Sequence, residues 1–429
     1  MKVLWVVNLI LPAFAEAEGL PFSEREGWLS GLYAAVRGAG ENRDLELAVA
    51  YPVAPGGKSE KKEWDGTVWY GFTEDLTRPE IYAERLEGDF AEILADFRPD
   101  LVHLFGTEFP HTLACLRALH DPERALVGIQ GICGGIAEHY MAGLPENVQH
   151  EATIRDRIRD DSLIRQQEKF RIRAAHEREA LTLARHVTGR TAYDERISGE
   201  INPERIYHPV NETLRSNFYT AARDRKQIVP HRIFLPQGDY PLKGFHYLLQ
   251  VLPELIGDYP DLTLVVAGNI VTGGDGRRIP LFLRIGAYGR YCNRLISKGH
   301  LREHVITTGR LSAERMCREM AASQVFVLPS EIENSPNSMG EAMLLGMPVI
   351  ASDTGGIPSL ITDKKEGLLV RPGDLEGLTA AIRQIFEEPV IADVYGENAK
   401  KRACVTHDPG RNLTALLKTY EQIAGGRRT

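Results

Sequence analysis

The sequence predicts an α/β protein with two doubly wound domains, each built on a mostly parallel sheet. Short apolar segments alternate with helical segments along the chain, which is the pattern of βαβ units. This pattern loosens between Thr191 and Pro230 and begins again at Arg232. A length of 429 residues is enough for two or three domains, each with its own core.

The first domain is expected to contain five buried strands. Their ranges are 3–7, 45–50, 101–104, 125–129 and 186–189. His103, inside the third of these strands, is either a side chain facing a ligand cleft or a satisfied core histidine. The charge-rich residues 155–185 carry both signs interspersed and are interpreted as a helix with a solvated face.

The second domain repeats the alternation. Its expected elements are a helix over 244–255 and strands at 233–235, 262–267, 305–308, 325–328 and 349–351. In sheets of this kind, ligands bind outside the carboxyl ends of the strands. We therefore expect the site of the second domain to lie in the loops that follow these strands.

The loop after the strand at 325–328 carries the most informative pattern. It reads E-N-S-P-N-S-M-G-E and leads into a helix over 338–345. A helix start offers free N–H groups to an anion, whereas Glu333 and Glu341 are acceptors suited to sugar or ribose hydroxyls. The combination indicates a nucleotide-sugar diphosphate. For Glu341 alone a capping box with Ser338 is the alternative.

Together with Gly355-Gly356, this stretch resembles the donor-binding signature of retaining glycosyltransferases of family four (glycosyl transferases group 1), which have the GT-B fold. The resemblance covers most of the chain and is clearer in the C-terminal half. It implies two Rossmann-like domains facing across a cleft, with a C-terminal helix that crosses back to the first. The expected parts are an acceptor-side domain over 1–215, a nucleotide-sugar domain over 216–393 and a returning helical segment over 394–429.

The resemblance also implies residue roles. Glu333 would lie by the donor sugar, and Glu341 would bind the ribose. The backbone amides that would hold the diphosphate belong to Asn337, Ser338, Met339 and Gly340. Gln237, Gly238 and Gly27 complete the implied donor-binding set, although Glu26 replaces the other glycine of the family's Gly-Gly pair.

Lys243 is the expected catalytic cation, because an ammonium at a strand end neutralises a leaving diphosphate. The chain departs from the family twice: Gln237 stands where an Arg precedes this lysine, and Gln130 stands where the family usually has a His. Glutamine cannot titrate near neutral pH. Retaining transfer is thought in this family to use the leaving phosphate as proton acceptor, so Gln130 is expected to position the sugar.

Composition excludes several other classes of protein. The formal charge of −8 argues against a general nucleic-acid binder. Five scattered cysteines without C-x-x-C spacing fit reduced thiols in a cytoplasmic protein.

There is no D-x-D motif, so neither a metal nor a cofactor besides the nucleotide-sugar is expected. The apolar start, interrupted by Asn8 and Pro12, indicates a buried strand rather than a signal peptide.

Residues 276–302 carry seven Arg or Lys side chains without an acidic residue. A plain surface helix is the preferred interpretation. A basic face for an anionic membrane surface, hence a peripheral membrane contact, or for a charged acceptor stays open.

The expected function is retaining transfer of a hexose from a nucleoside diphosphate, favoured as UDP, to a hydroxyl of a saccharide or glycolipid acceptor. Two alternatives stay open: a GT-B protein that binds nucleotide-sugar without transferring it, and an epimerase or phosphorylase of the same fold.

Overall fold

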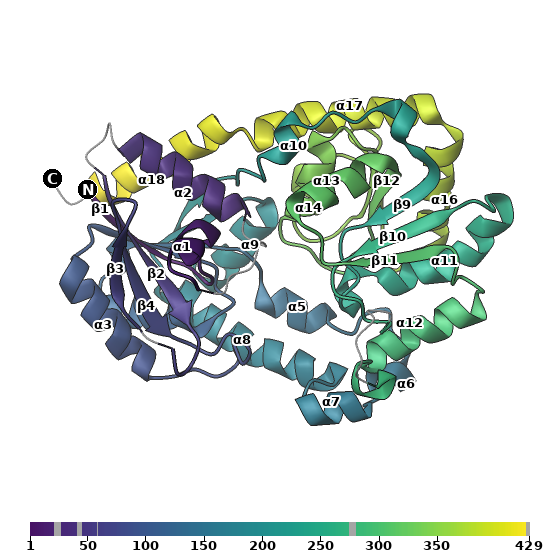
Figure 1. Ribbon diagram of the computed structural model, residues 1–429. Coiled ribbons are helices and arrows are strands. Elements are labelled where there is room, and N and C mark those ends of the chain that lie inside the picture. Colours follow the sequence, from purple (N-terminus) through teal and green to yellow (C-terminus); the bar gives the residue numbers. More distant parts are fainter. Residues whose placement is uncertain (21–26, 41–44, 58, 274–279, 426–429) are drawn as a thin grey trace. The chain divides into compact units, whose positions relative to one another are not determined.

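The computed structural model describes residues 1–20, 27–40, 45–57, 59–273 and 280–425. The chain forms two compact units (Figure 1). The first consists of Met1–Gly134, Lys169–Leu214 and His407–Thr429, and the second of Gly135–Glu168 and Arg215–Thr406.

The first unit is built on a sheet in which, among the described residues, eight strands take the order β3-β4-β2-β1-β5-β6-β7-β8. The strands are β1 (Lys2–Val6), β2 (Glu46–Val53), β3 (Lys61–Trp64), β4 (Thr67–Thr73), β5 (Leu101–Phe105), β6 (Ala125–Gly128), β7 (His186–Gly189) and β8 (Ile206–Pro209). Neighbours run parallel except for the β3–β4 pair. All five strands expected from the sequence are present. Three strands are additional: β3, β4 and β8. Of these, β3 and β8 lie at the sheet edges, where polar residues weaken the apolar pattern.

Two apolar cores cover the two faces of this sheet. Successive residues of β1 alternate between them: Leu4 and Val6 belong to one core, and Val3 and Trp5 to the other. This is the period of two that a strand buried on both faces requires. The helices of this unit are α1 (Pro12–Ala17), α2 (Gly27–Gly40), α3 (Arg85–Phe97), α4 (Pro110–Leu119), α9 (Ala192–Ile201), α18 (Pro409–Gly425) and most of α8 (Leu163–Leu183).

Helix α18 brings the end of the chain back onto the first sheet (Figure 1). Its Tyr420 is fully buried, and its hydroxyl accepts a hydrogen bond of 2.9 Å from Trp5 Nε1. The same hydroxyl lies 2.7 Å from His103 Nδ1. Burial lowers the pKa of His103 to about 3, so the ring is neutral. His103 is therefore a satisfied core histidine, and the expected return of the C-terminal helix is confirmed.

The second unit has a wholly parallel sheet in which the described strands take the order β11-β10-β9-β12-β13-β14. The strands are β9 (Val229–Leu235), β10 (Thr263–Ala267), β11 (Val305–Gly309), β12 (Ser323–Leu328), β13 (Val349–Ser352) and β14 (Leu368–Val370). The larger helices of this unit are α11 (Phe245–Asp258), α12 (Ala287–Lys298), α13 (Ala313–Ala322), α14 (Asn337–Leu344), α16 (Leu375–Glu387) and α17 (Pro389–Thr406), and the short ones are α10 (Asn217–Thr220) and α15 (Ile357–Leu360). The expected strands are present, and the three-residue β14 is an addition.

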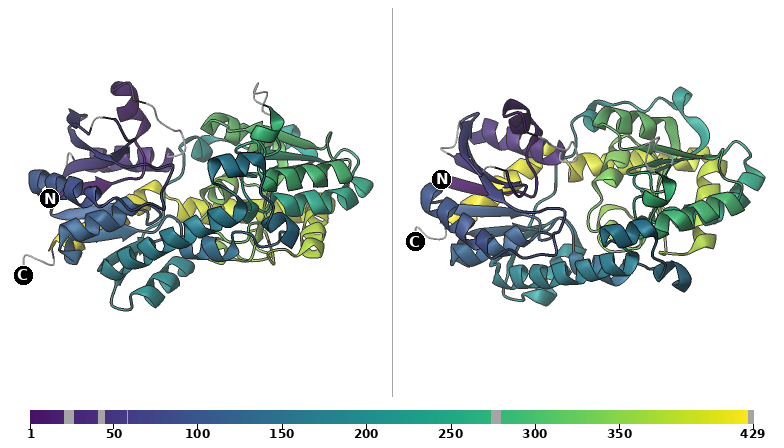
Figure 2. Two further views of the ribbon diagram at one scale, coloured as in Figure 1. Left: turned by 90° about the horizontal axis from the view of Figure 1, so that it is seen from below. Right: turned by 60° about the horizontal axis from the view of Figure 1, so that its bottom comes forward.

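The division of the chain differs from the expected boundaries in two places. The C-terminal part returns to the first unit at His407 rather than at residue 394, since α17 packs with the second unit. Residues 135–168 were expected in the first domain but belong to the second unit. We call them the excursion; they carry α6 (Glu146–Gln149), α7 (Ile154–Arg159) and most of α5 (Cys133–His139). Of these helices, α6 contacts α12, and the teal segment that carries it can be followed in Figure 2.

The expected single helix over 155–185 is two helices. Asp160 adopts a left-handed conformation, with φ of 51°, and ends α7 before α8 begins. The interpretation of α8 as a solvated face is also wrong for part of its length, because Glu177, Ala180 and Leu181 are buried. Over the described ranges, no helix is both long enough and apolar enough to cross a bilayer.

Candidate functional site

Two residues expected to be catalytic meet in the second unit, at the carboxyl ends of neighbouring strands. Lys243 ends a short 3-10 turn, η4 (Pro241–Lys243), that follows β9, and Glu333 lies in the loop after β12. Lys243 Nζ donates to Glu333 Oε1 at 2.6 Å, and Ser330 Oγ donates to the same oxygen at 2.8 Å. The two loops are also joined through their backbones, because Glu331 N donates to Leu242 O at 2.8 Å. The strand ends thus present an ion pair in which Glu333 is buried and Lys243 is partly buried.

Burial and the neighbouring Glu333 carboxylate shift the pKa of Lys243 in opposite directions. Removal from water pulls its pKa down, but the Glu333 carboxylate offsets this, so the pKa lies above its ordinary value. Lys243 is consequently a charged ammonium held in a poorly hydrated place. Such a group interacts far more strongly with an incoming anion than a lysine in water would.

Glycines hold the two loops in place. Gly244 has a φ of +69°, and a Cβ there would lie 2.0 Å from the Pro329 carbonyl oxygen. Gly355 has a φ of +53°, and a Cβ there would lie 2.0 Å from Glu333 O. Its neighbour Gly356 donates its N–H to that same oxygen at 2.9 Å. The Gly-Gly turn of the motif therefore supports the backbone of Glu333 directly.

Glu341 forms a second buried ion pair in this unit. Arg215 holds it with two hydrogen bonds: Nε donates to Oε1 and Nη2 donates to Oε2, both at 2.6 Å. Glu341 is only 3% exposed; burial raises its pKa, and the bonds from Arg215 oppose that rise. The alternative capping box is wrong, because α14 is preceded by Pro336 and no side chain caps it.

The start of α14 offers fewer amides than the sequence suggests. The N–H groups of Met339 and Gly340 donate to Pro336 O at 3.0 and 3.3 Å. Only the amides of Asn337 and Ser338 precede the first intrahelical bond. The N–H groups of Met339 and Gly340 are thus engaged within the helix, and a diphosphate contact at Asn337 and Ser338 stays a prediction.

Gln237 and Gly238 lie in the loop after β9, before Lys243. Gly238 N donates to Ala267 O at 3.2 Å, and a Cβ at Gly238 would approach Val266 Cγ1 to 2.6 Å. Close packing between β9 and β10 thus explains this glycine. The half-buried Gln237 lies at the same strand end as Lys243.

Gln130 and Gly27 belong to the first unit, whereas the other candidate residues belong to the second. Gln130 Nε2 donates to Glu212 Oε1 at 2.7 Å, and Arg190 Nη1 lies 2.6 Å from Glu212 Oε2. Arg190 Nη2 also donates to Gln130 O at 3.1 Å. Gln130 lines a cavity of about 40 Å³ with His103, Arg190 and Glu212. The side-chain amide of Gln130 is thus positioned by the Arg190–Glu212 pair.

Gly27 begins α2, and Glu26 lies outside the described residues.

Glu177 of α8 anchors the segment that follows Gln130. Its carboxylate accepts hydrogen bonds from Thr107 Oγ1 at 2.9 Å, Cys133 N at 3.0 Å and Gly134 N at 3.2 Å. Burial nevertheless raises the pKa of Glu177 to about 7. The folded state therefore holds a proton on this group more tightly than the unfolded chain, where a glutamate titrates near ~4.3.

Glu177 should give stability a distinct pH dependence. Because its folded pKa is the higher one, its favourable contribution is fully present below the unfolded pKa and is lost as pH rises toward 7. The shift corresponds to about 3 kcal/mol of unfolding free energy across that window. We expect Glu177→Gln to remove this slope and the matched Glu179→Gln, on the exposed side of α8, to retain it. Denaturant unfolding between pH 4.5 and 7 measures both; identical slopes would show that Glu177 does not titrate there.

The sequence did not indicate a role for Arg215, Glu212 or Glu177, and the reason differs for each. Arg215 ends the connection Y-H-P-V-N-E-T-L-R, whose loosened pattern gave no reason to single out one residue. Glu212 lies in the same connection. Glu177 is one acid among many on a charge-rich helix, so only its burial distinguishes it.

Comparisons with known proteins agree with this geometry. The sequence profile of the family described as glycosyl transferases group 1 matches residues 232–402. The GDP-mannose-dependent alpha-(1-6)-phosphatidylinositol monomannoside mannosyltransferase of Mycolicibacterium smegmatis is 28% identical over 163 residues, which are 36% of this chain and 38% of that protein. The alignments span less than two thirds of the length of the curated relatives.

Solved structures share the fold over nearly the whole chain. A sucrose-phosphate synthase from Thermosynechococcus elongatus has a TM-score of 0.69 at 17% identity and covers 99% of this chain and 100% of its own. HepE from Anabaena, solved in complex with UDP-glucose, has a TM-score of 0.67 at 16% identity and covers 98% of this chain and 100% of its own. At these identities the likeness establishes the fold, which is GT-B with two Rossmann-like domains. Residues 232–402, which lie in the second unit, are therefore similar to the glycosyl transferases group 1 family.

Proposed function

We propose that this protein transfers a hexose from a nucleoside diphosphate sugar to a hydroxyl of a saccharide or glycolipid acceptor, with retention at the anomeric carbon. The observation that carries the proposal is the ion pair between the partly buried Lys243 and the buried Glu333 at the strand ends. A lysine there suits a diphosphate, and a carboxylate there suits a sugar hydroxyl. Glu341, on α14 of the same unit, would take the ribose.

Donor binding would exchange the partners of the first pair. The diphosphate offers Lys243 a doubly charged partner, so the ammonium would turn from Glu333 to phosphate oxygen. Glu333 would then accept a hydrogen bond from a hydroxyl of the donor sugar. The amides of Asn337 and Ser338 would complete the diphosphate contacts at the positive end of α14.

The transfer step breaks the bond between the anomeric carbon and the phosphate oxygen and forms a bond from the acceptor oxygen on the same face of the sugar. The acceptor proton passes to the departing phosphate oxygen. Gln130, held by Glu212 and Arg190, would position the sugar without gaining or losing a proton. The proposal includes no metal ion and no further cofactor, because Lys243 would supply the positive charge that stabilises the leaving group.

The nucleotide is proposed to be uridine, and the setting polysaccharide or glycolipid assembly in the cytoplasm. One related protein is described as GDP-mannose-dependent, and a structure of the same fold holds UDP-glucose. Both nucleotides therefore belong in the test.

A panel of nucleotide-sugars tests the proposal. We expect one UDP-sugar to raise the melting temperature, since a ligand at a hundred times its dissociation constant adds about 2.7 kcal/mol of apparent stability. The same donor should release UDP when acceptors are added. Stabilisation by GDP-mannose instead would correct the nucleotide. Binding without any turnover would favour a non-transferring protein, and no binding by any donor would refute the proposal.

A further inference from the structure

Glu331 joins the loop that carries Glu333 to the turn that carries Lys243. Its backbone N–H donates to Leu242 O at 2.8 Å, and Leu242 directly precedes Lys243. Its backbone carbonyl accepts a hydrogen bond of 3.0 Å from Thr354 Oγ1, in the turn after β13. The backbone of this one residue therefore connects three strand-end loops of the second unit.

The side chain of Glu331 adds a fourth connection. Tyr247, in the first turn of α11, donates its hydroxyl to Glu331 Oε1, and both side chains are buried. Burial, and then this hydrogen bond, raise the pKa of Tyr247, so its hydroxyl keeps its proton and donates. A buried carboxylate that lost such a donor would be left poorly solvated. The bond thus ties Glu331 to the helix that begins two residues after Lys243.

The excursion, residues 135–168, confines the Tyr247 hydroxyl. Gly143 has a φ of +70°, and a Cβ there would lie 1.6 Å from the hydroxyl oxygen. Gly373 lies beside the same hydroxyl with a φ of +73°, but a Cβ there would lie 3.5 Å away, an ordinary van der Waals distance. Position 143 therefore has to be glycine if the hydroxyl is to stay where it reaches Glu331.

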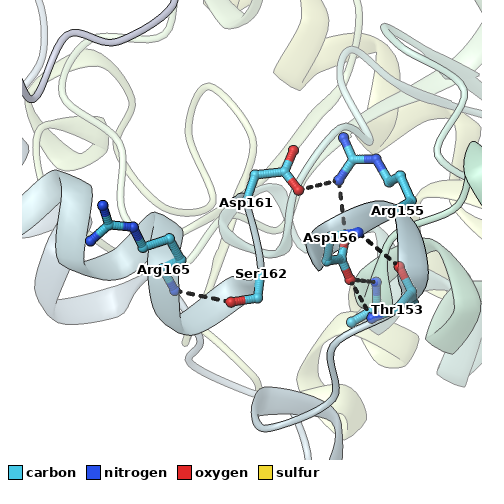
Figure 3. Close-up of polar contacts among 7 residues, drawn as sticks. Thr153, Arg155, Asp156, Asp161, Ser162 and Arg165 are labelled. Atoms are coloured by element: carbon cyan, nitrogen blue, oxygen red, sulfur yellow. Dashed lines mark hydrogen bonds and ion pairs between the residues drawn. The ribbon is translucent and has the colours of Figure 1, made fainter. Parts of the chain in front are cut away.

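The excursion is itself fastened to the second unit. Asp156 Oδ2 accepts the N–H of Ala287 at 2.9 Å, at the start of α12. Arg155 Nη1 donates to Asp156 Oδ1 at 3.0 Å and to Asp161 Oδ1 at 2.6 Å, so its guanidinium bridges two carboxylates (Figure 3). These bonds hold the segment that carries Gly143 against the second unit.

Part of the basic segment 276–302 belongs to the same attachment. Glu151 of the excursion accepts hydrogen bonds from Arg290 at 2.8 Å and from Arg294 at 3.1 Å. These two arginines are thus paired inside the protein. The members of the segment that lie outside the described residues include Gly276, Arg277 and Arg278.

We infer that Glu331 and Tyr247 are positioning residues for the Lys243–Glu333 pair, and that Gly143 of the excursion holds the Tyr247 hydroxyl in place. The inference rests on the proposed function, because that function gives the ion pair its role. Neither Glu331 nor Tyr247 would touch the donor; both would act through the loops that carry the pair. A displacement of about 1 Å at such a pair can cost roughly a hundredfold in rate.

Hydrogen exchange of the full chain tests the inference without a donor. The probe is the Glu331 amide, read by mass spectrometry in peptides spanning residues 330–335. We expect Tyr247→Phe to speed its exchange about tenfold, because the buried carboxylate loses a donor and the loop opens more often. Tyr259→Phe is the matched control. It removes a tyrosine–glutamate bond of 2.6 Å at the other end of α11 and should exchange like the unmodified protein.

Gly143→Ala tests the part played by the excursion. Its added methyl group would overlap the Tyr247 hydroxyl, so we expect the same faster exchange at Glu331. Gly373→Ala is the matched control, since it forces alanine into nearly the same positive φ but leaves the hydroxyl its room. Equal exchange rates in the two alanine variants would show that the excursion does not act on Tyr247.

Kinetics separates a positioning role from a merely structural one. Tyr247→Phe should lower kcat by about ten- to a hundredfold under conditions in which the variant is fully folded. In a protein that already carries Glu333→Gln, the same change should lower kcat little further, because both changes act on one ion pair. Glu331→Gln keeps an acceptor oxygen for the Tyr247 hydroxyl and should retain most of the turnover that Glu331→Leu loses.

The outcomes separate this inference from the proposed function. Unchanged exchange in Tyr247→Phe, or faster exchange with an unchanged kcat, would overturn the positioning role. Additive losses of kcat in the double variant would overturn it as well. Failure of the unmodified protein to turn over any donor would instead refute the proposed function, and the exchange rates would still show whether Tyr247 and Gly143 hold the loop.

Discussion

Replacing Lys243 by alanine is expected to abolish detectable sugar transfer. Lys243 is the only cation that the motif retains of the family's phosphate pair, since Gln237 occupies the other position. Removing one preorganised charge-stabilising donor typically costs about 2.7–4 kcal/mol in the transition state, a hundred- to thousand-fold in rate. Steady-state kinetics with a saturating donor measures the loss, and thermal unfolding verifies that the variant is folded.

Glu333→Gln is the matched variant for this experiment. It removes the charge at the other end of the same ion pair while keeping the shape of the side chain. We expect it to reduce the transfer rate and to leave the affinity for the free nucleoside diphosphate nearly intact, because its proposed partner is the sugar. If Lys243→Ala leaves turnover unchanged, or if both variants lose nucleotide affinity equally, the two assigned roles are wrong.

Glu341→Ala is expected to weaken binding of the free nucleoside diphosphate by ten- to a hundred-fold. A ribose hydroxyl pair would lose a charged acceptor, an interaction of about 1.5–3 kcal/mol. The same change should also destabilise the fold, because breaking a buried ion pair costs about 3–5 kcal/mol and Arg215 would be left without its carboxylate. Calorimetry with the nucleotide and denaturant unfolding give the two numbers separately.

Arg215→Met separates the two effects of Glu341. It removes the ion pair but keeps the carboxylate available to the ribose. We expect this variant to lose stability like Glu341→Ala and to keep nucleotide affinity within a few-fold. Equal loss of affinity in both variants would mean that Glu341 supports the loop and does not bind the ligand.

Most of the fold could be predicted from local patterns. The apolar runs that became β1, β5, β9 and β12 are buried on both faces, so their sequences identify them without tertiary information. The edge strand β3, with the sequence K-K-E-W, has no such run. It exists because β4 pairs with it, which no local pattern reports.

The excursion could not be predicted for a related reason. Its anchor joins Asp156 to Ala287, far away along the chain, through a backbone amide that any residue but proline would provide.

In the candidate site, the sequence motifs identified Glu333, Lys243 and Glu341 individually. The pairing of Glu333 with Lys243 and of Glu341 with Arg215 depends on how the strand-end loops and α14 approach their partners, and that is a property of the packed sheet.

The stereochemistry of the product tests the central claim most directly. In ¹H NMR of a reaction with an α-linked nucleoside diphosphate sugar, the anomeric signal of the donor should be replaced by that of an α-linked glycoside as nucleoside diphosphate appears. Lys243→Ala should show neither change. A β-linked product would contradict the retaining mechanism, and a donor signal that persists with every acceptor, although the donor binds, would contradict transfer itself.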